Sequence, residues 1–152
     1  MVSPQEHVLA RIQEYRGEGI VVTFDPSLCI HVGQCSRRLD AVFKPRERRW
    51  IRPDGASADE IAEVIRGCPS GALQYQRIDG APDEAPDDPT TVRPKRNGPL
   101  YLRGRLNVVD REGVTHESAR FALCRCGQSE NKPFCDNTHL RVGWQSDPVE
   151  PS

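Results

Sequence analysis

The sequence predicts an α+β protein made of two small domains. Its 152 residues are enough for one domain or for two small ones. Residues 1–80 alternate between amphipathic helix patterns and short β-type runs, whereas residues 99–147 contain mostly strand patterns. Between them, residues 81–98 are rich in proline and almost free of large apolar side chains. We therefore expect an α+β domain over 1–80, an extended linker over 81–98 and a mostly β domain over 99–147.

Two helices are predicted in the first domain, each beginning at a capping box. In the segments 3–6 and 57–60, a serine is followed three residues later by a glutamate, which is the spacing of that box. Apolar residues then recur at helical intervals until a glycine, Gly17 or Gly67, ends each pattern. The apolar positions of the first helix are Val8, Leu9, Ile12 and Tyr15.

Short strands complete both domains. β-Branched and aromatic residues bounded by turn residues predict them. They span residues 20–24, 49–52, 73–78, 99–110 and about 119–124. A short basic helix is expected after Cys35, a bulge at Gly104, and a turn over 110–113.

Composition excludes some classes of function. Charged residues make up 28% of the chain and the net charge is −1, so the molecule has no strong attraction to nucleic acid or to a membrane surface. No run is apolar and long enough to cross a bilayer, and the N-terminus lacks the apolar core of a secretory signal. Two groups of cysteines in such a chain predict a cytoplasmic protein, because thiols stay reduced there.

The second group of cysteines has the spacing of a metal centre. Cys124 and Cys126 are two residues apart, so an extended segment places both side chains on one side. Cys135 and His139 are four apart, so a helix beginning after Pro133 would carry both on one face. Three sulfurs and one nitrogen suit tetrahedral zinc or an iron–sulfur cluster. The single residue between the first two cysteines is tighter than the usual zinc spacing and suits two thiolates on one iron.

The order of residues in this stretch resembles a known family. The pattern Cys-x-Cys-x2-Ser-x3-Pro-x-Cys-Asp-x-Thr-His is similar to that of the CDGSH-type, mitoNEET-like iron–sulfur proteins. Asn137 stands where that family usually has glycine, and asparagine tolerates the left-handed backbone that such a turn needs. The resemblance implies a mostly β domain and, since the family forms intertwined dimers, a homodimer. It also implies a 2Fe–2S cluster on Cys124, Cys126, Cys135 and His139.

The first group of cysteines resembles a divergent single-cluster ferredoxin. Cys29 and Cys35 stand at the outer places of a ferredoxin triplet, and Cys68 opens a distant Cys-Pro-Ser-Gly-Ala-Leu segment. The resemblance covers about residues 21–78 and implies a small ferredoxin-like α+β domain. It also implies a 3Fe–4S cluster on these three thiolates, or a 4Fe–4S cluster with another ligand. Val32 occupies the central ligand place and cannot bind iron. The neighbouring His31 is more typical of a residue that lies beside a cluster or in solvent than of a ligand.

These features favour an electron carrier over an enzyme. No nucleophile–base pair and no phosphate-binding glycine loop is present, so we expect no catalytic residues. A basic stretch over 37–52 either docks an acidic redox partner or forms a solvated face, and we favour the latter. Single-electron transfer to redox partner proteins is the expected function. The alternatives are transfer of a cluster to an acceptor or redox and pH sensing, and a zinc-stabilised interaction module. No nucleic-acid or membrane partner is expected.

Overall fold

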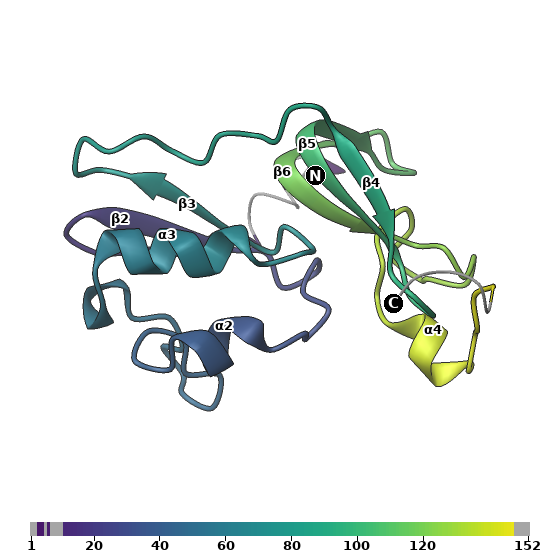
Figure 1. The fold of residues 1–152 in the computed structure, drawn as a ribbon, viewed down its shortest axis with the longest axis horizontal. Coiled ribbons are helices and arrows are strands. Elements are labelled where there is room, and N and C mark those ends of the chain that lie inside the picture. The colour runs from purple at the N-terminus through teal and green to yellow at the C-terminus, as the bar shows by residue number, and fades with distance from the viewer. Residues whose placement is uncertain (1–2, 5, 7–10, 148–152) are drawn as a thin grey trace.

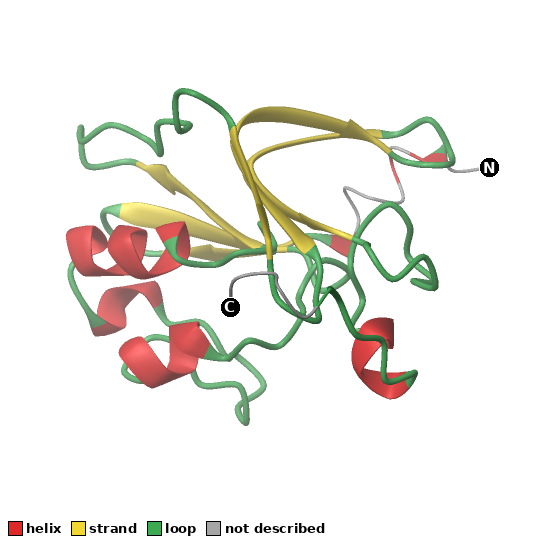
Figure 2. Cartoon of the chain, turned by 45° about the vertical axis from the view of Figure 1, so that its right-hand side comes forward, coloured by secondary structure: helices red, strands yellow, loops and turns green. Residues whose placement is uncertain are grey.

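The computed structural model describes residues 3, 4, 6 and 11–147. In these residues the chain forms two antiparallel three-stranded sheets, ordered β1-β2-β3 and β4-β5-β6 (Figures 1 and 2). The elements in chain order are β1 Gln13–Arg16, β2 Ile20–Phe24, α2 Gln34–Arg38, η1 Pro53–Gly55, α3 Ala58–Arg66, β3 Leu73–Arg77, β4 Thr91–Pro94, β5 Leu100–Val109, β6 Thr115–Leu123 and α4 Thr138–Arg141. The predicted α+β class, with a second region that is mostly β, is confirmed.

Helix α3 forms as its sequence predicts. Ser57 accepts a hydrogen bond from the backbone N–H of Glu60, and the Glu60 carboxylate accepts one from the N–H of Ser57, which completes the capping box. The face of α3 that carries Ile61 and Ile65 is fully buried against the first sheet (Figure 1). Burial of each such side chain stabilises the fold by roughly 1.5–3 kcal/mol. The helix ends at Gly67, the residue before Cys68.

The N-terminal helix was predicted to continue to Gly17, and this prediction is wrong for its last turn. Gln13–Arg16 is strand β1, and Tyr15 lies opposite Val22 of β2. Pairing with the central strand supplies backbone hydrogen bonds that override the local helical pattern. The predicted capping box is present between Ser3 and Glu6, whereas Val8 and Leu9 lie outside the described residues.

The predicted strand over 49–52 is also absent as a strand. Ile51 makes only an isolated antiparallel bridge with Phe43, inside a loop that Trp50 closes against Phe24 and Phe43. The backbone N–H of Lys44 donates to the Trp50 carbonyl, so the segment folds back on itself instead of joining the sheet. The apolar side chains of this loop pack in or against the core. Their burial explains why the sequence of the segment resembles a strand.

The second sheet is built on the β5–β6 hairpin. Asp110 closes its turn by accepting hydrogen bonds from the N–H groups of Glu112 and Val114. The register shifts between Arg103 and Leu106, which confirms the predicted bulge at Gly104. A side chain at Gly104 would collide with Thr90.

The segment 81–98 does more than connect the two sheets. Thr91–Pro94 forms β4 and pairs with β5, with Pro94 at its end, where a missing N–H is tolerated in an edge strand. Glu84 lies in the part that runs along the outside between β3 and β4 (Figure 1), and it pairs with Arg120 of β6. The predicted linker therefore also supplies one strand and one partner of a buried ion pair.

The two sheets share one hydrophobic core. Phe121 of β6 and Phe134 belong to the same buried cluster as Ile20, Val22 and Phe24 of β2. The rings of Phe121 and Phe134 lie 5.5 Å apart. Packing across the two regions fixes their relative position. Among the described residues, no helix has the length and apolarity needed to cross a membrane.

Candidate metal centres

The predicted ligands of the C-terminal centre form two close pairs. The Sγ atoms of Cys124 and Cys126 are 3.8 Å apart, and Cys135 Sγ lies 3.7 Å from Nδ1 of His139. Two ligands of one tetrahedral metal stand about 3.8 Å apart if both are thiolates and about 3.6 Å apart if one is imidazole, given metal–ligand bonds of about 2.0–2.3 Å. Each pair is thus spaced to share one metal. In the described part of the chain, no group of three or more His, Cys, Asp and Glu side chains is arranged to hold a single ion.

The loop between the two pairs is folded by its own polar side chains. Ser129 donates from its hydroxyl to the carbonyl of Phe134 at 2.6 Å and accepts from the N–H of Asn131. Asp136 accepts from the N–H of Glu130 and from both the N–H and the hydroxyl of Thr138. Ser129 and Asp136 therefore set the position of the ligand loop, and β6 anchors it at Leu123, which bridges to Phe134.

Cys135 and His139 meet by a route that differs from the predicted one. The helix α4 begins only at Thr138, so Cys135 precedes it and the two do not share a helical face. Asn137, with φ of 69°, turns the chain left-handed between them, as predicted for this position. Its backbone N–H points at Cys135 Sγ, at 3.5 Å. The left-handed turn, not helical periodicity, brings the two ligands together.

The pKa shifts of Cys124 and His139 favour metal binding, whereas that of Cys135 opposes it. Partial burial opposes ionisation of Cys124, but the backbone N–H groups of Ser129 and Gly127 outweigh it, and the pKa of this thiol is lower than usual. Burial lowers the pKa of His139, so its imidazole stays in the neutral, metal-binding form to more acidic pH than a free histidine. Burial raises the pKa of Cys135, which must lose its proton when a metal binds.

The predicted N-terminal ligands line one pocket. Cys29, Cys35 and Cys68 surround about 350 Å³ of empty space, part of it open to solvent. Val32 and His31 lie at its rim, and the His31 Nδ1 atom is 3.8 Å from Cys29 Sγ. Val32 is 41% exposed and contributes only carbon atoms. The pocket therefore offers three thiols, with one imidazole beside the first.

Burial keeps the thiols of Cys29 and Cys35 neutral when no metal is bound. It is the largest cause that raises the pKa of Cys29 and of Cys35, and the neighbouring Cys68 raises both further. Binding of a metal cluster must therefore release protons, so its affinity rises with pH. Phe24, Trp50 and Leu73 are among the apolar residues that line the same pocket.

Comparison with known proteins identifies both regions. Residues 15–78 match the family described as a divergent 4Fe-4S mono-cluster, and residues 97–140 match the family described as an iron-binding zinc finger of CDGSH type. The chain belongs to the divergent 4Fe-4S mono-cluster family, and joins that domain to a CDGSH-type domain. It is 40% identical over 62 residues to uncharacterized protein YjdI of Escherichia coli strain K12, and to the protein of the same name in O157:H7. These residues are 41% of this chain and 82% of each relative.

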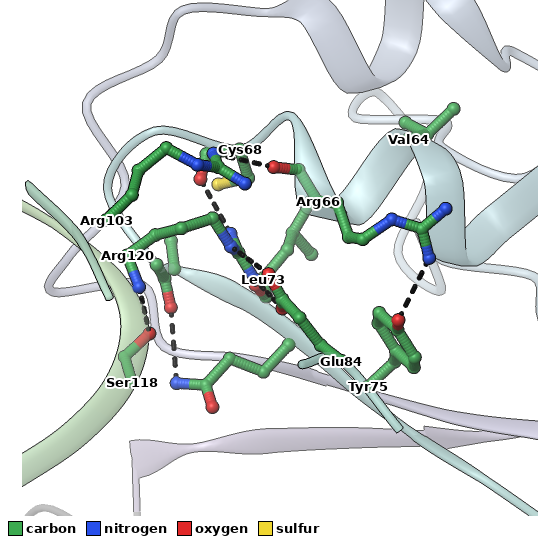
Figure 3. A network of polar contacts seen from close by, with 12 residues as sticks. Val64, Arg66, Cys68, Leu73, Tyr75, Glu84, Arg103, Ser118 and Arg120 are labelled. Carbon is green, nitrogen blue, oxygen red and sulfur yellow. Dashed lines mark hydrogen bonds and ion pairs between the residues drawn. The ribbon is translucent and has the colours of Figure 1, made fainter. Parts of the chain in front are cut away.

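The mono-cluster domain and the CDGSH domain are both iron–sulfur cluster-binding domains. Arg120 of the CDGSH domain makes hydrogen bonds to the mono-cluster domain. This side chain of β6 is fully buried. It donates to the backbone carbonyls of Cys68, at 2.6 Å, and Leu73, at 3.0 Å, and makes two hydrogen bonds to Glu84 (Figure 3). An arginine of the CDGSH domain thus holds the backbone of a predicted ligand of the mono-cluster domain.

Sequence reasoning missed Arg120. Its only local signal is a charged residue next to the apolar end of a predicted strand, between Ala119 and Phe121. Gly71 of the Cys-Pro-Ser-Gly segment shows the same approach of the two domains, because a side chain there would collide with the backbone carbonyl of Arg120. With φ of 75°, Gly71 also needs the conformational freedom of glycine.

Tyr101 of β5 packs against the small buried cluster of Ile30, Ala122 and Cys135. Burial raises the pKa of its phenol, and negative charge on Cys135 and on Cys68 raises it further. The phenol is therefore next to a cluster that contains a predicted ligand of the C-terminal centre.

Much of the basic stretch over 37–52 is engaged within the chain. Arg37 donates to the carbonyl of Val32 at 2.9 Å, and Arg38 pairs with Glu63 at 3.5 Å. Arg52 pairs with Glu47, and the guanidinium of Arg49 lies over the ring of Tyr15. These contacts fit the solvated face that the sequence favoured.

Proposed function

We propose that this protein carries single electrons between redox partners, with two unlike clusters in one chain. The observation that carries the proposal is the packing of two different cysteine sets into one body, with ligand pairs and a pocket of matching chemistry. Cys124, Cys126, Cys135 and His139 would hold a 2Fe–2S cluster, and Cys29, Cys35 and Cys68 a 3Fe–4S or a 4Fe–4S cluster. Each cluster, when bound, accepts and releases one electron.

The surroundings of the ligands support this role. Backbone N–H groups of Gln128 and Asn137 point at the sulfurs of Cys126 and Cys135, at 3.4 and 3.5 Å. Hydrogen bonds to sulfur stabilise the reduced cluster and so tune its potential. The loop around them is rigidly bonded, which keeps the geometry constant when the charge changes.

The remaining features of the proposal follow from the sequence. We propose that the chain is not an enzyme, binds no nucleic acid or membrane, and acts on redox partner proteins as a homodimer. All cysteines are free thiols in the described structure, and we place the protein in the cytoplasm, where thiols stay reduced.

Anaerobic purification tests the proposal directly. Iron and sulfide are counted, and absorbance and EPR spectra are recorded before and after reduction with dithionite. Two distinct EPR signals, one from each cluster, are the expected result. A colourless protein with stoichiometric zinc would instead identify a zinc-stabilised interaction module.

A second candidate function is cluster transfer or redox and pH sensing. The half-buried Cys124 lines a pocket of the CDGSH domain, with Gly127 and Lys132, that is open to solvent. Access from solvent to one ligand pair allows an acceptor protein to take the cluster. Loss of 2Fe–2S absorbance on mixing with an apo-acceptor, at a rate that rises with acceptor concentration, would favour this function.

Replacing Val32 with cysteine is expected to convert the N-terminal cluster toward 4Fe–4S. The three thiols leave one corner of a cuboidal cluster without a protein ligand, so the native cluster is expected to be 3Fe–4S as isolated. A cysteine at position 32 would supply the missing thiolate. EPR spectra and iron counts of the anaerobic variant measure the change. A native 4Fe–4S cluster that is stable in air and unchanged by His31→Ala would contradict this expectation.

Replacing His139 with cysteine is expected to make the 2Fe–2S cluster more resistant to acid and lower its potential. Protons compete with iron for the neutral imidazole, so histidine should leave first as the pH falls. The substitution also adds one negative charge to the cluster, which disfavours the reduced form. Decay of cluster absorbance at several mildly acidic pH values compares the two proteins. Equal decay rates would show that His139 is not the acid-sensitive ligand.

A further inference from the structure

Ile30 touches both predicted cluster sites. It follows Cys29 directly in the chain and lines the pocket of the mono-cluster domain. The same residue is 6% exposed and belongs to one small buried cluster with Ala122 and Cys135 of the CDGSH domain. One residue therefore separates the N-terminal pocket from a ligand of the C-terminal centre.

Asn137 makes a polar link across the same contact. Its side-chain amide donates to the carbonyl oxygen of Ile30 at 2.7 Å, although the two residues are 107 positions apart. Its backbone N–H points at Cys135 Sγ at 3.5 Å. The atoms of Asn137 thus connect a predicted ligand of one centre to the peptide that carries Cys29 of the other.

We propose that Ile30 and Asn137 form a bridge through which one electron passes directly between the two cluster sites. The bridge runs from Cys135 Sγ through the Asn137 N–H, along its side chain to the Ile30 carbonyl, and through the peptide to Cys29. This inference rests on the proposed electron-transfer function and adds to it that the two centres exchange electrons inside one chain.

The route favours electron transfer because it consists of covalent bonds and short polar contacts and is surrounded by packed side chains. Electron tunnelling weakens steeply across gaps, and here the only non-covalent steps are one N–H···S contact and one N–H···O hydrogen bond. Ile30 and Tyr101 fill the space beside the link with side chains instead of solvent. A glycine in place of Asn137 would keep the left-handed turn and lose the link to Ile30.

The step balances without further reactants. With clusters held by the two predicted ligand sets, one electron would be lost by the reduced cluster of lower potential and gained by the oxidised cluster of higher potential. No bond breaks and no proton is transferred. Asn137 and Ile30 are positioning residues, because they act through the ligands that they touch.

Two measurements on the full-length, anaerobically purified protein test the bridge. In dithionite-reduced protein, the second paramagnetic centre should speed spin relaxation of the 2Fe–2S signal, so the signal saturates at higher microwave power than in Cys68→Ser, which lacks the N-terminal cluster. Flash reduction with a photoexcited deazaflavin then follows re-equilibration between the clusters by absorbance. Asn137→Gly should slow that exchange severalfold, because it removes one of the two non-covalent steps of the route.

The control is Asn131→Ala. Asn131 also donates its side-chain amide across the domain contact, to the carbonyl of Ser27 at 2.9 Å. Ser27 is separated from Cys29 by Leu28, and Asn131 reaches Cys135 only through Phe134, so this route between the ligands is longer. This variant should exchange electrons at the wild-type rate. In Asn137→Gly, cluster content and both potentials should stay at wild-type values, because the backbone N–H to Cys135 remains; a change caused only by loosened structure would alter them.

The outcomes separate the bridge from the proposed function. Wild-type exchange rates in Asn137→Gly, with both clusters present, would overturn the bridge and leave the electron-transfer function standing. Absence of clusters from the wild-type protein would overturn both. If Asn137→Gly loses a cluster, Asn137→Asp provides the test, because aspartate tolerates the left-handed backbone but has no side-chain N–H to donate to the Ile30 carbonyl. Slower exchange supports the bridge, and an unchanged rate rejects it.

Discussion

Replacing Arg120 with alanine is expected to lower the free energy of unfolding by about 3–5 kcal/mol. The guanidinium is fully buried, and the side chain of its partner Glu84 is 11% exposed. Alanine would leave the Glu84 carboxylate without its counter-charge and the carbonyls of Cys68 and Leu73 without donors. The variant should also bind the N-terminal cluster more weakly, because the backbone of Cys68 loses its support.

Anaerobic urea unfolding followed by tryptophan fluorescence measures the effect. Trp50 packs against Phe24 in the first domain and reports on the core that Arg120 closes. Arg103→Ala is the matched control, because Arg103 also comes from the second sheet and donates to a carbonyl of α3, that of Arg66. Its side chain is 37% exposed and its partner Asp87 47%, so the loss should be about 0–1 kcal/mol. Equal decreases in the free energy of unfolding in the two variants would show that the buried ion pair stabilises the fold no more than the exposed one.

Arg120→Lys is expected to lower the free energy of unfolding by an amount between those of Arg120→Ala and Arg103→Ala. A lysine retains the charge opposite Glu84 but cannot present the planar fork that reaches Cys68, Leu73 and Glu84 at once. A lysine variant as stable as the wild type would attribute the effect to charge alone.

Replacing Cys126 with serine is expected to abolish the 2Fe–2S signal completely. The variant loses one of the two sulfurs that are 3.8 Å apart and are spaced to share one metal. The N-terminal signal should remain, because Cys29, Cys35 and Cys68 line a separate pocket. EPR and visible spectra of the anaerobic variant check both parts of the prediction.

The converse control is Cys35→Ser, which should remove only the N-terminal signal. Loss of both signals in a folded Cys126→Ser protein, judged by its circular dichroism, would indicate one shared site. In a partly reduced sample, in which both clusters of the wild type are paramagnetic, the remaining N-terminal signal of the variant should relax more slowly, because its paramagnetic neighbour is gone. This comparison reports how close the two centres are.

The sequence by itself determined the local elements and the chemistry of both ligand sets. Helix α3 formed as predicted because the Ser57 capping box, its apolar face and Gly67 agree with one another. The hairpin, its turn at Asp110 and the bulge at Gly104 were predictable for the same reason. The four predicted ligands of the C-terminal centre were identified from spacing, residue type and family resemblance, all of which are read from one short stretch of sequence.

Local patterns failed where a distant partner decided the structure. Gln13–Arg16 has helical spacing, but pairing with β2 made it a strand. Residues 49–52 have a strand pattern, but their apolar side chains serve the core from a loop. The segment 81–98 has the composition of a linker, yet β5 and Arg120 recruit Thr91–Pro94 and Glu84 from it.

Only the tertiary structure decided how the two cluster domains stand to each other. The contacts of Arg120 with Cys68 and of Asn137 with Ile30 join residues 52 and 107 positions apart. Neither contact has a periodicity or a motif, because each depends on one side chain reaching a backbone carbonyl of another segment. Burial makes such contacts specific, since a buried donor or acceptor without a partner costs about 1–3 kcal/mol. The sequence therefore predicted two iron–sulfur domains, and folding packed these domains against each other.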